Sequence, residues 1–167
     1  MKIKDIFLSA DFIGAVAIAI ALTGLLPTHL DNDFAKDFYS IGISVLSIVF
    51  SVFFAALAVI ISASDNDFVM FLEEDGSYSN LIKVFRFTLG ILFVALLYSV
   101  ALYGLTAVWI TSKGETQGKW WFITFCFLFL YSLFSAYNST YDSINYAKFR
   151  AIYLKQQKQD RNTNSET

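Results

Sequence analysis

The chain has little with which to build a conventional active site or a disulfide framework. Its 167 residues include one cysteine, Cys126, and one histidine, His29. A single cysteine cannot form an internal disulfide, and zinc sites built from several thiolates are excluded. A histidine-dependent nucleophile would have to use His29, which no G-x-S-x-G or similar motif accompanies. Walker-type and G-x-G-x-x-G phosphate loops are also absent from the sequence. We therefore expect no catalytic residues, no metal site and no cofactor.

Charged residues are scarce, and they are unevenly distributed. They make up 16% of the chain, against 56% hydrophobic residues, whereas soluble domains are about a quarter charged. All 26 lie outside four uncharged runs of 19, 27, 26 and 22 residues, which are Phe12–Leu30, Phe38–Ser64, Phe87–Ser112 and Trp120–Tyr141. A bilayer core about 30 Å thick needs about 20 apolar residues per helix. The sequence therefore predicts an integral membrane protein and excludes a soluble enzyme.

These runs predict an all-α bundle of four transmembrane helices. We place the membrane domain at residues 1–141, with helices at approximately 8–28, 38–63, 86–112 and 120–142. Residues 142–167 are predicted to form a cytoplasmic helical extension, with an unstructured tail from residue 159. The net charge of −2 provides no basic field for nucleic acid, so we expect no direct contact with it.

Lysine and arginine counts predict the orientation of the bundle. Nine lie in the N-terminal, second-loop and C-terminal segments, namely Lys2, Lys4, Lys83, Arg86, Lys148, Arg150, Lys155, Lys158 and Arg161. Three lie in the first and third loops, namely Lys36, Lys113 and Lys119. Because positive residues favour the cytoplasmic side, both termini are predicted to be cytoplasmic. The expected location is the bacterial cytoplasmic membrane.

The first run has a cleavable signal peptide as an alternative reading. Lys2 and Lys4 form a basic start, and Ala17-Ile18-Ala19 has the small residues of a cleavage site. Apolar sequence continues past this point to Leu26. Cleavage would therefore fall inside the hydrophobic stretch, and a retained helix is the favoured interpretation.

The second loop predicts a short amphipathic helix at the inner membrane surface. Ser64 or Asp65 can cap its start, the apolar residues Phe68, Phe71 and Leu72 share one face, and Gly76 can end it. Asn80 is then expected to cap the third transmembrane helix. The loop is acidic at Glu73, Glu74 and Asp75, whereas the C-terminal segment is basic at Lys148 and Arg150. These five residues are candidates for binding a soluble partner, although a solvated surface is the simpler interpretation.

Polar and small residues lie on predicted faces of the second and fourth helices. Tyr131, Ser135, Asn138 and Asp142 follow one face of the fourth helix, where contact with lipid would be costly. This face predicts either the inner vestibule of a pore or a hydrogen-bonded bundle core. Small residues on the second helix include Ser47 and Ser51, which permit close helix packing within the bundle or at a subunit interface.

A layer of charges is predicted near the inner membrane boundary. Asp11, Arg86 and Asp142 fall at similar depth in the predicted topology. An unpaired ion in such surroundings is costly. We therefore expect a clamp in which Arg86 contacts Asp11 or Asp142, and a structural role is favoured over a proton relay.

Two functions from different classes follow from this sequence. The first is an oligomeric pore or membrane-permeabilising effector with Ser47, Ser51, Tyr131, Ser135, Asn138 and Asp142 as candidate lining residues. The second is a non-conducting anchor that recruits a soluble cytoplasmic partner. Phenylalanines in the outer half of the fourth helix weigh against an open pore, so the two are nearly balanced. Membrane lipids and further copies of the chain are the other expected partners.

One short motif and the overall architecture carry weak resemblances. The N-x-x-Y-D run at Asn138–Asp142, with Arg150 beyond it, is similar to a segment that follows the second helix of bestrophin-type channels. The aromatic residues expected there are missing, so no function is transferred. In architecture the chain resembles small multi-pass proteins that act on membranes in prokaryotic defence operons. That resemblance implies a defence effector but assigns no residue to the role.

Overall fold

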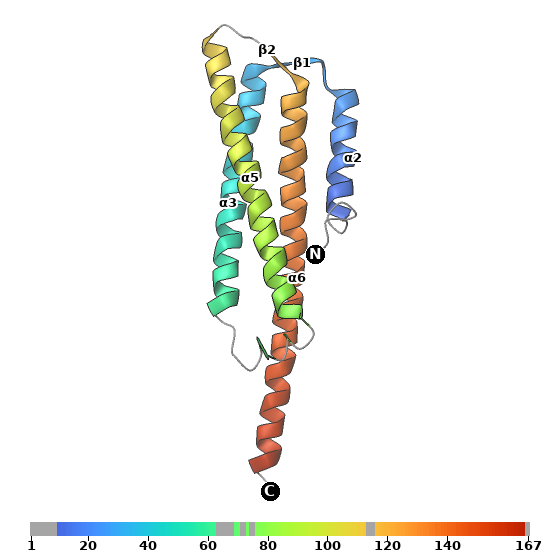
Figure 1. Ribbon diagram of the computed structural model, residues 1–167, viewed down its shortest axis with the longest axis vertical. Coiled ribbons are helices and arrows are strands. Elements are labelled where there is room, and N and C mark those ends of the chain that lie inside the picture. The colour runs from blue at the N-terminus through green and yellow to red at the C-terminus, as the bar shows by residue number, and fades with distance from the viewer. Residues whose placement is uncertain (1–9, 63–68, 71–72, 74–75, 113–115, 166–167) are drawn as a thin grey trace.

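The chain folds as an elongated bundle of helices (Figure 1). The computed structural model describes residues 10–62, 69–70, 73, 76–112 and 116–165. The bundle consists of α2 (Ala10–Leu25), α3 (Asn32–Ser62), α5 (Ser77–Thr111) and α6 (Lys119–Ser165). One pair of short strands, β1 (His29–Asp31) and β2 (Thr116–Gly118), joins the loops at one end. The predicted all-helical fold class is confirmed.

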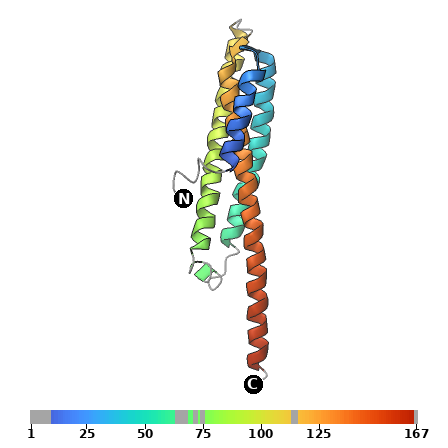
Figure 2. The same cartoon turned by 90° about the vertical axis from the view of Figure 1, so that its right-hand side faces the viewer.

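Helix α6 is the centre of the bundle. It packs against α2 on one side and against α5 on the other, and α3 packs mainly against α5. Figure 2, turned by 90°, shows α6 continuing beyond the ends of α3 and α5. The start of α2 lies partway along the bundle, whereas the end of α6 lies far beyond it. These two helix ends are therefore at very different levels along the long axis (Figure 1).

Three helices are long and apolar enough to cross a membrane, namely α3, α5 and α6. Helix α2 is apolar, but its 16 described residues span only about 24 Å at 1.5 Å per residue. That is shorter than a hydrocarbon core of about 30 Å. The three long helices indicate an integral membrane protein, whereas a fourth crossing stays a prediction.

Helices α3 and α5 begin before the predicted second and third transmembrane segments. Helix α3 begins at Asn32 rather than residue 38, because Asp31 Oδ1 accepts hydrogen bonds from the backbone N–H groups of Asp33 and Phe34 at 2.7 and 3.3 Å. Such a side-chain cap satisfies backbone donors at a helix start. Helix α5 begins at Ser77 rather than residue 86, so Asn80 lies inside its first turn and does not cap it.

Gly76 separates the second loop from α5. Its φ of 74° lies in the left-handed region, where glycine carries no steric penalty. Its N–H donates to the carbonyl of Glu73 at 3.0 Å, as expected at a helix end. Val69, Met70 and Glu73 are helical, but most of the short helix predicted for this loop lies outside the described residues.

The end of the chain also differs from expectation. Helix α6 continues to Ser165, so the unstructured tail predicted from residue 159 is wrong over its described part. The predicted helical extension beyond residue 142 is present and longer than expected.

An unpredicted strand pair closes the end of the bundle where α3 begins. β1 and β2 run antiparallel, with Leu30 opposite Gln117. The buried Gln117 Nε2 donates to the Tyr39 hydroxyl at 3.2 Å. Lys119 Nζ donates to the Thr23 carbonyl at 2.9 Å, which ties the end of α2 to the start of α6. The first and third loops are therefore joined rather than independent.

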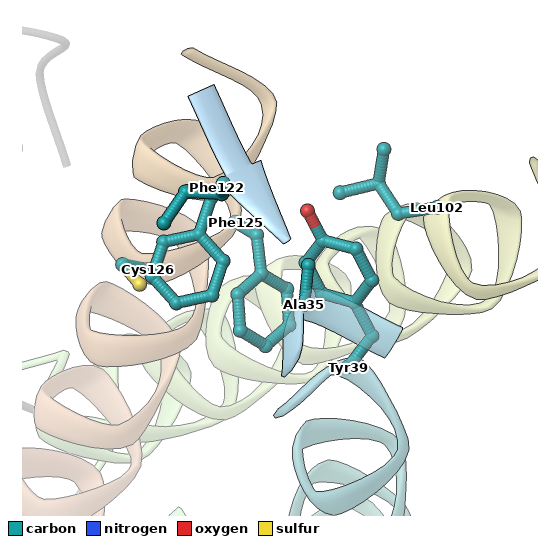
Figure 3. Close-up of a cluster of buried hydrophobic side chains, with 7 residues drawn as sticks. Ala35, Tyr39, Leu102, Phe122, Phe125 and Cys126 are labelled. Atoms are coloured by element: carbon teal, nitrogen blue, oxygen red, sulfur yellow. The ribbon is translucent and has the colours of Figure 1, made fainter. Parts of the chain in front are cut away.

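Two clusters of buried apolar side chains form the core. The cluster beneath the strand pair contains Leu30, Ala35, Tyr39, Leu102, Phe122, Phe125 and Cys126 (Figure 3). The second cluster lies further toward the end of the bundle from which α6 projects and includes Leu46, Phe53, Phe85 and Leu92. In lipid, association of helices depends on close packing and hydrogen bonds between them. These clusters therefore set the relative positions of α3, α5 and α6.

Candidate functional site

The polar face predicted on α6 is divided between two neighbouring helices. Ser135 and Ser139 are buried and face α5, where the Thr88 hydroxyl lies 3.0 Å from the Ser135 hydroxyl and 2.7 Å from that of Ser139. Thr88 was not among the residues that the sequence singled out. This hydroxyl cluster satisfies its own hydrogen bonds inside the chain, which is the arrangement expected of a bundle core.

Tyr131 and Asn138 lie toward α2. Asn138 Nδ2 donates to Asp11 Oδ1 at 2.6 Å. The Tyr131 ring meets the Phe12 ring edge-on, with centroids 5.7 Å apart. These contacts fix α2 against α6. Asn138 itself is exposed, and so is Asp142 one turn further along.

The predicted charge clamp is not formed among the described residues. Asp11 pairs with the amide of Asn138, and no ion pair links Arg86 to Asp11 or Asp142. A side-chain amide N–H can donate to a carboxylate, so Asp11 has a hydrogen-bond partner other than Arg86. Arg86 is exposed and lies instead at the edge of a groove with Lys83.

Ser47 and Ser51 lie on α3 and do not share a lined path with the α6 residues. The Ser51 hydroxyl donates to the Ser47 carbonyl at 2.9 Å within the same helix. Ser51 is exposed and Ser47 half-buried. Within one chain, the described α3 serines form no hydrogen bond with Ser135, Asn138 or Asp142. The candidate lining residues therefore occupy separate faces.

The end of the bundle beneath the strand pair is filled by aromatic rings. Phe125 is 1% exposed, and its ring centroid lies 4.9 Å from that of Tyr39 and 5.7 Å from that of Phe129. Gly42 on α3 lies directly against this ring, because a Cβ built there would be 2.5 Å from Phe125 Cζ. Figure 3 shows the Tyr39 and Phe125 rings side by side. The interior of the chain is therefore closely packed beneath the strand pair.

Two of the three acidic partner-binding candidates, Glu74 and Asp75, lie outside the described residues. Glu73 is engaged within the chain, since its carboxylate accepts from the Ser79 N–H at 3.0 Å and the Ser79 hydroxyl at 2.5 Å. It therefore stabilises the first turn of α5. Among the basic candidates, Lys148 is exposed and Arg150 is half-buried on α6.

The part of α6 from Tyr141 onward carries exposed apolar side chains. Tyr141, Ile144, Phe149 and Ile152 are 59%, 50%, 60% and 55% exposed, and we call these four residues the α6 strip. At about 100° per residue, the four side chains cover an arc of about 140°, a broad face of the helix. On another side, the Tyr146 ring lies 6.4 Å from that of Tyr78, near the start of α5. In the sequence, this strip is visible as the apolar residues Ile144, Phe149 and Ile152 after Asp142. They were not singled out, because attention went to the polar face of the same helix.

A groove lies between α2 and α5, with α6 as its floor. Its volume is about 760 Å³, within the range of small-molecule and lipid sites. Its walls are apolar except at one end, where Lys83 and Arg86 lie. We call it the basic groove.

Neither a metal site among the described residues nor a match to a known protein indicates the function. The described residues contain no group of three or more His, Cys, Asp and Glu side chains able to hold a metal ion. Comparison with family models, curated proteins and solved structures finds no match for this chain. The class of protein is therefore defined by the fold alone. It is a helical bundle in which three helices are long and apolar enough to cross a membrane.

Proposed function

We propose that the protein is a non-conducting membrane anchor that recruits a soluble cytoplasmic partner through α6. The observation that carries this proposal is the α6 strip, which lies on a helix that continues beyond the bundle (Figure 2). An amphipathic helix with exposed apolar anchors suits a hydrophobic groove on another protein. Lys148 and Lys155 are also exposed on this segment, so the partner's groove is expected to carry acidic residues at its rim.

The proposed topology has four membrane crossings, including α2, and both termini in the cytoplasm. The lysine and arginine distribution supports it, because nine of twelve fall in the N-terminal, second-loop and C-terminal segments. The same argument favours the bacterial cytoplasmic membrane. The acidic loop at Glu73–Asp75 and the basic Lys148 and Arg150 would then face the same compartment as the α6 strip.

An oligomeric pore or membrane-permeabilising effector is the second candidate. One observation favours it: Ser40, Ser44 and Ser51 are exposed on α3 in the single chain. Small residues at this spacing permit close approach of another helix in lipid, so the edge suits contact with a second copy. The self-satisfied hydroxyl cluster at Thr88 and the filled interior at Phe125 favour the anchor instead.

Photo-crosslinking in native membranes tests the anchor. The full-length chain with benzoylphenylalanine in place of Phe149 is expected to crosslink to one soluble protein. Ile152→Asp should reduce that crosslink at least tenfold, because a carboxylate in an apolar contact is costly. Ala147→Asp, which introduces the same charge on the same segment outside the α6 strip, should leave it within about twofold.

Planar-bilayer recording of the purified protein gives the complementary result. The anchor predicts no stepwise conductance under voltage or in anionic lipid. Stepwise currents that change with Ser51→Leu or Ser135→Leu would contradict the anchor and establish the pore. A crosslink at residue 149 that joins only copies of this chain would equally count against the anchor.

A further inference from the structure

The basic groove has an aromatic wall and a wall formed by α5. On the aromatic side, Phe12 meets Phe127 and Tyr131 edge-on with ring centroids 5.7 Å apart, and Phe127 stacks on Tyr131 at 5.9 Å. These three rings hold one another in place across α2 and α6. The surface they form is apolar and preformed, which favours a hydrocarbon chain over a polar ligand.

The opposite wall is formed by α5. Phe87, Gly90, Ile91 and Val94 line it, and Val94 is 55% exposed. A Cβ built at Gly90 would have nothing within 4 Å, so glycine leaves open space here. The groove therefore has open space beside a residue without a side chain.

Both cations of the groove lie at the same end of this wall. Lys83 and Arg86 are exposed, and neither forms an ion pair with a carboxylate in the described part of the chain. They are one turn apart on α5, so both can approach a single anion. Arginine binds phosphate through two parallel hydrogen bonds, and lysine adds a mobile point charge.

The length of the groove fits one leaflet of a bilayer. From Lys83 to Val94 the α5 wall rises about 16 Å at 1.5 Å per residue, about half of a 30 Å hydrocarbon core. A headgroup beside Lys83 and Arg86 would place its acyl chain along Gly90 and Val94 toward the bilayer centre.

We propose that the basic groove binds one anionic phospholipid, with its phosphate at Lys83 and Arg86 and one acyl chain between α2 and α5. Anionic lipids are abundant in the cytoplasmic leaflet, and basic sites between transmembrane helices recognise their headgroups. The bound chain would fill the gap between two helices that otherwise meet mainly through α6. This assignment is independent of whether the protein is an anchor or a pore.

Native mass spectrometry of the full-length protein with dioleoyl phosphatidylglycerol or dioleoyl phosphatidylcholine tests the site. The wild type is expected to retain one phosphatidylglycerol per chain and to prefer it over phosphatidylcholine at least tenfold, the effect of one charge-assisted contact. Lys83→Gln with Arg86→Gln should abolish this preference. The charge-conserving pair Lys83→Arg with Arg86→Lys should retain most of it.

Two matched controls distinguish effects at the groove from general effects of lost charge or added side-chain volume. Lys148→Gln with Arg150→Gln removes the same charge from α6 and should leave binding unchanged. Gly90→Phe should reduce retention of both lipids, because its ring occupies the acyl-chain space. Gly104→Phe, at another open glycine on α5, should not. All variants are compared at equal helical circular dichroism and elution volume.

Three results would overturn the proposal. Equal retention of the two lipids by the wild type would remove the headgroup preference. Unchanged retention in the Lys83/Arg86 double variant would place the phosphate elsewhere. Unchanged retention in Gly90→Phe would place the acyl chain outside the groove.

Discussion

Gly42→Leu is expected to lower the free energy of unfolding by about 3 kcal/mol, the upper end of overpacking effects in cores. A Cβ at this position would lie 2.5 Å from Phe125 Cζ and 2.9 Å from Cε2. The Phe125 ring has little room to move, since it is fully buried between Tyr39 and Phe129. The added side chain must therefore push α3 away from α6.

Reversible unfolding in mixed micelles, followed by far-ultraviolet circular dichroism, measures this loss. Gly104→Leu is the matched control, because its Cβ would meet nothing within 4 Å. Leucine has a higher helix propensity than glycine, so this control should be neutral or slightly stabilising. A loss in Gly42→Leu no larger than in Gly104→Leu would show that α3 and α6 do not approach closely at Gly42.

Phe125→Ala alone is expected to lower the free energy of unfolding by about 3 kcal/mol, as for buried aromatic residues truncated in cores. The Phe125 ring is packed among Phe38, Tyr39, Phe122 and Phe129. Its removal leaves a cavity beneath the strand pair and forfeits these packing contacts. Phe54→Ala is the control, because Phe54 is 61% exposed on α3, and it should lose less than about 1 kcal/mol.

The two substitutions should be strongly coupled. In Gly42→Leu with Phe125→Ala, the leucine side chain occupies space that the ring has vacated. The double variant should therefore be more stable than the sum of the single losses predicts, by at least about 1 kcal/mol. Additive losses would contradict direct packing of α3 on α6 at this level.

Three of the four uncharged runs fall in helices that are long and apolar enough to cross a membrane, because the exclusion of charge from such helices is a strong signal. Each of α3, α5 and α6 coincides with most or all of one uncharged run. The same criterion does not show where α3 begins, because Asp33, Lys36 and Asp37 lie within its first turns. Helices can continue beyond the apolar core, so a charged residue marks a change of surroundings and not a helix end.

The strand pair could not be predicted from the local sequence. β1 and β2 each have three residues, with a single inward side chain, Leu30 or Gln117. Alternation needs a longer segment before it becomes visible. The pairing depends on how the bundle brings the first and third loops together, and only the three-dimensional arrangement contains that information.

The candidate site was only partly accessible to sequence reasoning. Ser135 was singled out, but its partner Thr88 resembles any other uncharged residue of an apolar run. The Arg86 clamp was expected on the rule that buried ions pair, but Asn138 supplies a neutral donor to Asp11. Helical spacing places residues on a face, but it does not determine which neighbouring helix that face contacts.

Side-specific cysteine labelling tests the four-crossing topology on which this account depends. In a Cys126→Ser background, single cysteines replace Thr116, Ser77 or Lys155, all exposed, and a tag precedes residue 1. An impermeant maleimide applied to intact spheroplasts should label only position 116, and the tag should become accessible only after permeabilisation. Access to the tag from outside would contradict the crossing by α2, and labelling at 77 or 155 in intact spheroplasts would contradict the proposed orientation.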